Sequence, residues 1–158
     1  MTIAVGAEAP DFELPSSTLE NDRPGKKYRL SDYRGQVVVL CFYPLDFSPV
    51  CSTENACLRD DLKGLEDAGA RVFGVSVDSH WTHLAFARHL SLAYPLLADF
   101  HPKGAVADKY GLYLQDKGFT SRATVIIGKD GRVSWVKVQG LGEARSDAEI
   151  LEAVRALG

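Results

Sequence analysis

Uninterrupted apolar runs mark the predicted strands of this chain. The longest extends from Val37 to Tyr43 and is rich in β-branched and aromatic residues, with no alternation between polar and apolar positions. Such a run predicts a strand that is buried on both faces. Shorter runs of the same kind occupy 71–77 and 122–127. A turn at 129–131 and an alternating run at 132–138 follow the last of these, which predicts a hairpin with a half-exposed outer strand.

Segments with helical periodicity lie between and after these runs. Residues from about 51 to 68 are rich in helix formers and place leucines on one face, so they predict a long helix. A second helix is predicted at 80–89 and a short third one at 102–110. Ser146 and Glu149 have the spacing of a capping box, which predicts a final helix that begins at Ser146.

The order of these elements is strand, helix, strand, helix, hairpin, helix. A strand–helix–strand start indicates parallel central strands with helices on both faces, and the closing hairpin adds antiparallel strands. We therefore predict a thioredoxin-like α/β fold, a central mixed β-sheet flanked by helices, formed by one domain over residues 1–158. The stretch 15–27 is rich in turn formers, and we expect it to be a surface loop of that domain.

Composition excludes several classes of protein. The 158 residues are 46% hydrophobic and 25% charged with a net charge of -3, so a basic nucleic-acid surface is not expected. The four histidines and three cysteines show no metal-site spacing, and nothing in the sequence calls for a cofactor. No apolar stretch is long enough to span a membrane, and no targeting segment is visible at the start. We therefore expect a cytoplasmic protein with free thiols, in which any disulfide is transient and catalytic.

Cys51 is the candidate nucleophile on position alone. It follows a buried strand and a short loop, where the long helix should begin. Helix N-termini carry partial positive charge and favour the thiolate, which is the reactive form. The alternative is that Cys51 is a small core residue, which is the interpretation that fits Cys41 inside the apolar strand. Ser48 lies close enough to turn its hydroxyl toward the sulfur or a bound oxygen, and Pro44 stiffens the bend.

Several motifs of the chain resemble one known family. PLDFSPVC matches the peroxiredoxin active-site pattern, Pro-x-x-x-Thr/Ser-x-x-Cys. GAEAPDFELP, GVSVDSHWTHLAF, YPLLADFHPKGAVADKYG and SRATVIIGKDG are similar to further peroxiredoxin segments, in the same order and spacing. The resemblance covers nearly the whole chain. It implies a thiol-dependent peroxidase that reduces hydrogen peroxide and organic hydroperoxides.

The resemblance also assigns roles to residues around the thiol. Cys51 would be the peroxidatic cysteine, Pro44 would shield its sulfur, and Ser48 would hydrogen-bond the peroxide. Arg122 matches the arginine that reaches the thiolate from a distant strand, although such a residue is also typical of a solvated strand end.

Two further positions belong to the same loop. The backbone N–H groups of Val50 and Cys51 would bind the peroxide oxygens, on which negative charge builds up. Glu54 would support the loop or Arg122. The alternative interpretation is that Glu54 is an acid of the first helical turn, where the helix dipole favours a negative charge.

The second half of the cycle depends on Cys57. Peroxiredoxin Q, also called bacterioferritin comigratory protein, typically has four residues between its two cysteines, whereas here Ser52 to Ala56 intervene. Six residues of helix rise about 9 Å, and a disulfide needs Cα atoms within about 7 Å. The segment around Cys51 also resembles the one-cysteine alkyl hydroperoxide reductase E type, in which an external thiol resolves the sulfenic acid. In either case the resemblance implies a thioredoxin-like or low-molecular-weight thiol reductant, and a homodimer.

Two other hypotheses start from the same thiol. A redox sensor would carry the same motif but pass its oxidation to a partner protein without sustained peroxide loss. A general thiol–disulfide oxidoreductase is disfavoured, because the chain has no C-x-x-C and no proline before Ser121 and Arg122, where thioredoxins keep one.

Overall fold

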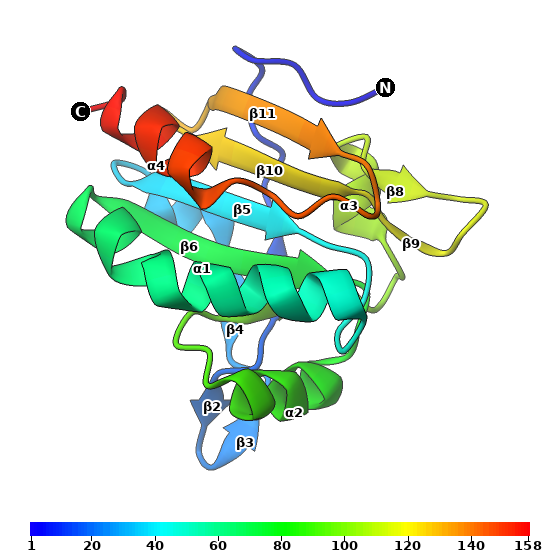
Figure 1. Ribbon diagram of the computed structural model, residues 1–158. Coiled ribbons are helices and arrows are strands. Elements are labelled where there is room, and N and C mark those ends of the chain that lie inside the picture. Colours follow the sequence, from blue (N-terminus) through cyan, green and yellow to red (C-terminus); the bar gives the residue numbers. More distant parts are fainter.

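A five-stranded mixed sheet forms the centre of the protein, described here by a computed structural model of residues 1–158 (Figure 1). Its strands lie in the order β11-β10-β5-β6-β7. They are β5 (Val37–Phe42), β6 (Ala70–Ser76), β7 (Leu96–Ala98), β10 (Arg122–Ile127) and β11 (Val133–Gln139). Strands β5, β6 and β7 are parallel, whereas β10 runs antiparallel to both of its neighbours. The predicted mixed sheet and its closing hairpin are confirmed.

Strand β5 explains the uninterrupted apolar run. Side chains alternate between the two faces of a strand. Val37, Val39 and Cys41 belong to the core on one face, and Val38 and Leu40 to the core on the other. Both faces of the sheet are therefore covered, and no polar position is tolerated in the strand between them.

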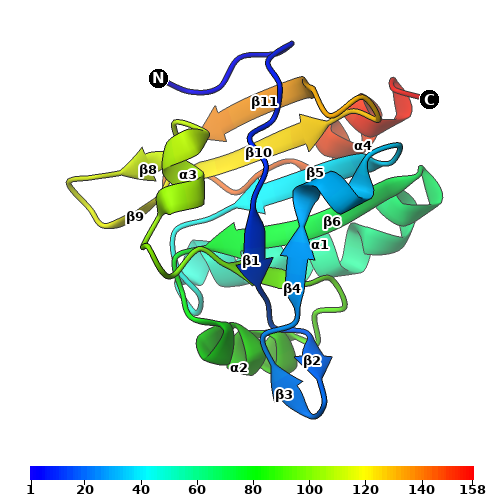
Figure 2. The ribbon, with the colours of Figure 1, turned by 180° about the vertical axis from the view of Figure 1, so that it is seen from behind.

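Helices and short strands cover the two faces of the central sheet. The helices are α1 (Pro49–Asp67), α2 (His80–Leu90), α3 (Ala105–Lys109) and α4 (Asp147–Arg155), with a 3-10 turn η1 (Leu30–Tyr33). Helices α1 and α4 lie across one face, with α2 beside them at the β7 edge (Figure 1). The other face carries α3 and the N-terminal segment (Figure 2). No helix is both long and apolar enough to cross a bilayer.

Three expectations about the elements need correction. The stretch 15–27 is not a plain loop, because it contributes to two small antiparallel pairs of strands. Their members are β1 (Glu13–Pro15), β4 (Lys27–Arg29), β2 (Leu19–Glu20) and β3 (Arg23–Pro24). The third helix, predicted at 102–110, is shorter in the structure and is limited to α3, because turns precede it. A further small pair of strands, β8 (Tyr113–Leu114) and β9 (Phe119–Thr120), follows it. Strand β7 was not predicted at all, because three residues are too short for a periodic signal.

The sheet register brings distant segments to one edge. Strand β5 ends at Phe42, and Ala123 of the antiparallel β10 is its partner. Arg122 therefore lies just beyond the carboxyl end of β5, where the loop to α1 begins. Its own partner across the hairpin is Gln139, so the segment after β11 leaves the sheet at the same edge. Carboxyl ends of parallel strands are where α/β proteins place their sites.

Candidate active site

Cys51 lies in the first turn of α1 and is fully buried. The helix begins at Pro49 with Ser48 as its N-cap, so it starts two residues earlier than the sequence predicts. Proline is well suited to the first helical position, because it has no N–H to leave unpaired there. The backbone N–H groups of Val50 and Cys51 have no hydrogen-bond acceptor. Two free donors of a helix N-terminus thus lie beside the thiol.

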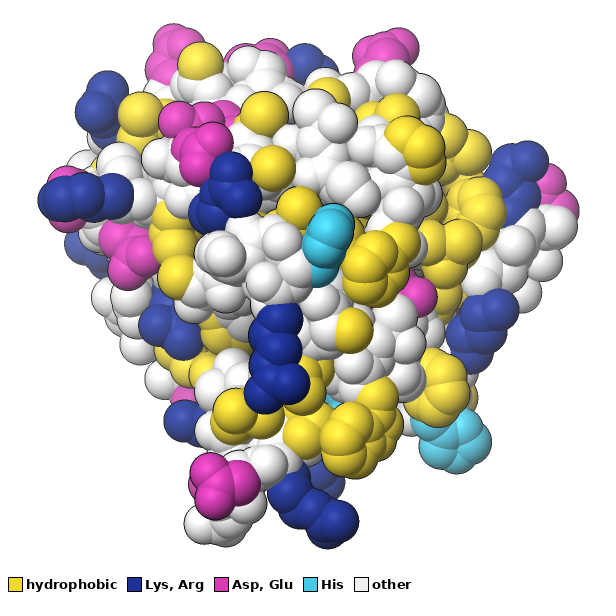
Figure 3. All heavy atoms as spheres, turned by 60° about the horizontal axis from the view of Figure 1, so that its bottom comes forward, with side chains coloured by type: hydrophobic (Ala, Val, Ile, Leu, Met, Phe, Trp, Pro, Cys, Tyr) yellow, Lys and Arg dark blue, Asp and Glu magenta, His cyan; other side chains and the backbone are white.

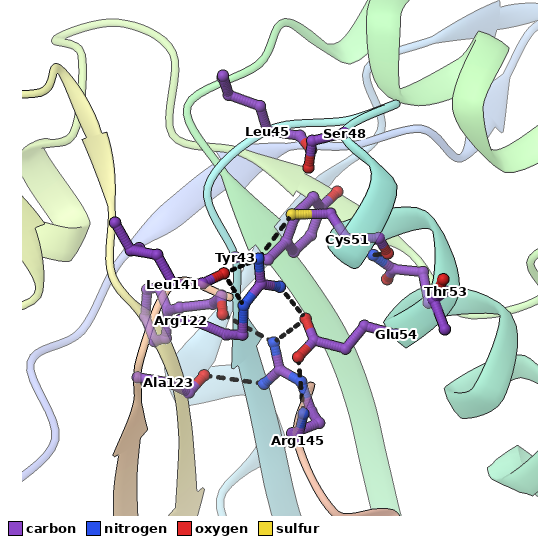
Figure 4. A network of polar contacts seen from close by, with 12 residues as sticks. Tyr43, Leu45, Ser48, Cys51, Thr53, Glu54, Arg122, Ala123, Leu141 and Arg145 are labelled. Carbon is purple, nitrogen blue, oxygen red and sulfur yellow. Dashed lines mark hydrogen bonds and ion pairs between the residues drawn. The ribbon is translucent and has the colours of Figure 1, made fainter. Parts of the chain in front are cut away.

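Arg122 reaches the sulfur from the opposite side of the site. Its Nη2 donates to Cys51 Sγ at 3.4 Å, although the two residues are 71 positions apart in the chain (Figure 4). Its Nε and Nη2 both donate to the carbonyl of Leu141, at 3.1 and 2.9 Å. The guanidinium is 2% exposed, so the alternative of a solvated strand-end charge does not hold.

Glu54 joins Arg122 to a second arginine that the sequence analysis missed. Its Oε1 accepts from Arg122 Nη1 and, at 3.0 Å, from Arg145 Nη2. Its Oε2 accepts from the Arg145 backbone N–H at 2.8 Å. Arg145 also donates to the carbonyls of Phe42 and Ala123, at 2.8 and 2.9 Å, and so ties the loop after β11 to the end of the sheet. The sequence offers only an indirect signal for Arg145, which is its position directly before Ser146, the N-cap of α4.

The charges of this buried cluster do not cancel when the thiol is neutral. Arg122 and Arg145 bring two positive charges and Glu54 one negative charge, and all three side chains are at most 3% exposed. A buried charge is costly unless it is paired. The thiolate of Cys51 would supply the missing negative charge. The cluster therefore places an excess of positive charge beside the sulfur, which lies 3.4 Å from Arg122 Nη2.

Pro44 and Ser48 are the two remaining residues of the loop before α1, and their surroundings differ. Pro44 is buried directly after β5, where it stiffens the bend into the loop. The hydroxyl of Ser48 donates to the carbonyl of Leu45 at 3.1 Å, so its hydrogen bond stays within the loop (Figure 4). The hydroxyl oxygen keeps its lone pairs free to accept a hydrogen bond.

The other two cysteines have contrasting surroundings. Cys41 is 1% exposed, and burial raises the pKa of its thiol to about 11, which agrees with an inert packing role. Cys57 is exposed on the intact helix α1. Partial burial and the nearby carboxylates of Asp147 and Asp61 raise the pKa of the Cys57 thiol. The Cys57 thiol is therefore accessible to solvent, but its surroundings do not favour the reactive thiolate.

This arrangement defines a class of protein: a thioredoxin-like fold with a buried thiol at the start of a helix and a guanidinium against its sulfur. The family model described as "AhpC/TSA family" matches residues 5–136. Peroxiredoxin-2 of Mus musculus is 39% identical over 159 residues, covering 96% of this chain and 78% of that protein. Alkyl hydroperoxide reductase E of Mycobacterium bovis is 34% identical over 154 residues, covering 97% of both chains. The reduced 2-Cys peroxiredoxin of Plasmodium vivax superposes with a TM-score of 0.88 at 32% identity, covering 97% of this chain and 81% of that one.

The chain belongs to the AhpC/TSA family, and it is a peroxiredoxin, a thiol-dependent peroxidase. The resemblance drawn from the sequence and the thioredoxin-like fold are both confirmed.

Proposed function

We propose that the Cys51 thiolate attacks hydrogen peroxide and organic hydroperoxides at one oxygen of the O–O bond. The sulfur takes up that oxygen and becomes a sulfenic acid, while the other oxygen leaves with a proton as water or an alcohol. The observation that carries this proposal is the contact between Arg122 Nη2 and Cys51 Sγ, 3.4 Å long, at a helix start with two free N–H donors. It is tested by replacing the sulfur, as argued in the Discussion.

The groups around the sulfur fit the charge that develops in this displacement. Negative charge grows on both peroxide oxygens as their bond breaks, and fixed donors aimed at it lower the barrier. Arg122 and the N–H groups of Val50 and Cys51 would provide these donors. Glu54 and the Leu141 carbonyl hold the guanidinium in place, so it does not reorganise during the reaction.

Pro44 and Ser48 complete the proposed substrate site. Ser48 donates its proton to Leu45, so its oxygen is available to accept a hydrogen bond from the peroxide O–H. Pro44 covers the bend after β5 and would keep water away from the sulfur. Its ring has no N–H that would require solvation.

A second thiol then resolves the sulfenic acid, with release of water and formation of a disulfide. We propose Cys57 for this step, because it lies on the same helix and is exposed. About 9 Å of helical rise separates it from Cys51, so the first turns of α1 must unwind. An external thiol is the alternative, and it requires opening as well, because Cys51 is fully buried. A thioredoxin-like donor or a low-molecular-weight thiol would reduce the disulfide.

Mass spectrometry after one equivalent of hydrogen peroxide tests this assignment. We expect the wild type to lose two hydrogens as a Cys51–Cys57 disulfide forms, whereas Cys57→Ser should retain one added oxygen on Cys51. Because the pKa of Cys57 lies above its ordinary value, its thiolate fraction and the rate of disulfide formation should increase as the pH rises. A sulfenic acid that persists equally long in both proteins assigns this step to an external thiol.

We also propose that the protein forms a homodimer in a reducing, cytoplasmic environment. Leu45, Phe47, Trp81 and Phe100 follow the ends of the three parallel strands and are 38% to 59% exposed. Hydrophobic side chains gather on this side of the molecule (Figure 3). Exposed apolar patches of this kind mark association sites. In sedimentation velocity we expect a species heavier than the 17.2 kDa chain, and a single species of that mass would contradict the proposal.

A further inference from the structure

The loop from Pro44 to Ser48 is tied to the rest of the protein mainly through Asp46. The backbone N–H of Asp46 donates to Asp78 Oδ2 at 2.9 Å, and its side chain accepts from the Tyr43 hydroxyl. The hydrogen bond of Ser48, by contrast, stays within the loop. Asp46 is only 8% exposed, although it lies on a surface loop. What holds Asp46 therefore holds the segment that leads into α1 and Cys51.

Besides Tyr43, the Asp46 carboxylate binds one further buried side chain, His83 of α2. His83 Nδ1 lies 2.7 Å from Asp46 Oδ2, and neither side chain is exposed. His83 Nε2 lies 3.0 Å from the carbonyl of Leu97, which can only accept. Nε2 therefore carries a proton, and the ring bridges β7 to the loop.

The ring and the carboxylate share one more proton. Burial raises the pKa of Asp46, and the hydrogen bond from His83 opposes that rise. Whichever partner carries the proton, the hydrogen bond between them is kept. Asp78, which faces Asp46 from the end of β6, is itself occupied by Ser76 and the Asp46 backbone. Both carboxylate oxygens of Asp46 and both ring nitrogens of His83 thus have protein partners.

The loop also contains a residue in an unfavourable backbone conformation. Phe47 directly follows Asp46 and has a φ of 68°, in the left-handed region that non-glycine residues avoid. Such a conformation persists only where surrounding contacts fix it. The Phe47 ring lies against Phe86 and His89 of α2, with centroid distances of 5.0 and 5.8 Å. Helix α2 therefore holds the loop at two successive residues.

We propose that His83 is a positioning residue of the peroxidase. Through Asp46 it keeps the loop and the first turn of α1 closed, so that Cys51 stays against Arg122. Release of this hydrogen bond opens the loop and exposes Cys51 to a second thiol. The inference rests on the proposed role of Cys51 as the nucleophile.

Two substitutions of His83 separate its two hydrogen bonds. The amide nitrogen of His83→Asn takes the place of Nδ1 and can still donate to Asp46. That of His83→Gln takes the place of Nε2 and can donate only to the Leu97 carbonyl. Both variants are compared with the parent in a Cys57→Ser background, in which Cys51 is the only thiol at the helix start. The first readout is the rate of Cys51 oxidation by hydrogen peroxide, and the second is its rate of alkylation by a biotin-linked maleimide.

We expect His83→Gln to be oxidised about tenfold more slowly and alkylated about tenfold faster than its parent, as the loss of one buried charge-assisted hydrogen bond predicts. His83→Asn should stay within about threefold of its parent in both rates. A general loss of packing would change both variants alike, so a difference between His83→Gln and His83→Asn distinguishes positioning from stability. Unchanged rates in His83→Gln, or equal changes in the two variants, overturn the proposal.

If His83→Gln does not fold, Asp46→Ala and Asp46→Asn repeat the comparison from the loop side. Asparagine can still donate to Nδ1 and accept from Tyr43, whereas alanine can do neither. We expect faster alkylation of Cys51 in Asp46→Ala but not in Asp46→Asn. Equal alkylation rates in the two variants overturn the proposal. Failure of the proposed function is a separate outcome, because it would leave peroxide consumption intact in Cys51→Ser.

Discussion

Replacing Cys51 by serine is expected to abolish sustained peroxide consumption, with kcat/KM lowered at least about a thousandfold. A serine hydroxyl remains protonated and is a far weaker nucleophile than a thiolate, so the positive cluster around it has no nucleophile to stabilise. The variant should keep its fold, because serine is close to cysteine in size. The measurement is the decay of hydrogen peroxide in the presence of excess dithiol reductant.

Cys41→Ser and Cys57→Ser are the controls for this experiment. Cys41 is 1% exposed in the core and Cys57 is exposed on α1, and neither is hydrogen-bonded to the sulfur of Cys51, whose partner is Arg122. With excess reductant both variants should continue to turn over. A Cys51→Ser protein that consumed peroxide at the wild-type rate would disprove the assigned nucleophile. One equivalent of oxidation by the wild type without turnover would favour the redox-sensor alternative.

Replacing Arg122 by methionine is expected to lower the rate of Cys51 oxidation by about 10² to 10³-fold, the usual effect of removing one donor aimed at developing charge. The variant also leaves Glu54 with Arg145 as its only charged partner, so the cluster no longer carries an excess positive charge. Stopped-flow oxidation of the reduced protein by hydrogen peroxide measures this rate directly.

Arg122→Lys and Arg155→Met provide the comparison. Lysine keeps the charge but lacks the planar fork that reaches the Leu141 carbonyl, Glu54 and the sulfur together, so an intermediate rate is expected. Arg155 lies exposed at the end of α4, and its replacement should not change the rate. An Arg122→Met protein oxidised as fast as the wild type would show that this contact does not contribute to the chemistry.

The central sheet was predictable because its strands are buried on both faces. The resulting apolar runs at β5 and β10, and the alternation along β11, are local signals that leave little freedom for other structures. Cys51 and Arg122 were found through the family motifs around them. Their contact itself follows from the register, which places Arg122 beyond the end of β5.

The parts that sequence reasoning missed depend on contacts between distant segments. Arg145 lies in an irregular segment, and only the folded protein shows that it binds Glu54, which is 91 positions earlier in the chain. The hydroxyl of Ser48 donates to the Leu45 carbonyl, an orientation that local sequence does not determine. Of the short strand pairs at 13–29, β1 and β4 contribute Leu14 and Tyr28 to the core, so packing rather than a periodic signal stabilises them.

The place of Arg145 near the end of the chain has a consequence for biosynthesis. Its side chain binds the Phe42 carbonyl across 103 positions, so the site is completed by a segment that is translated well after the loop it joins. Cys51 leaves the ribosome long before its charged surroundings can assemble, and a domain of this kind folds as a unit once its chain is available. The nascent protein therefore carries an ordinary cysteine until the segment with Arg145 has left the ribosome and joined the site.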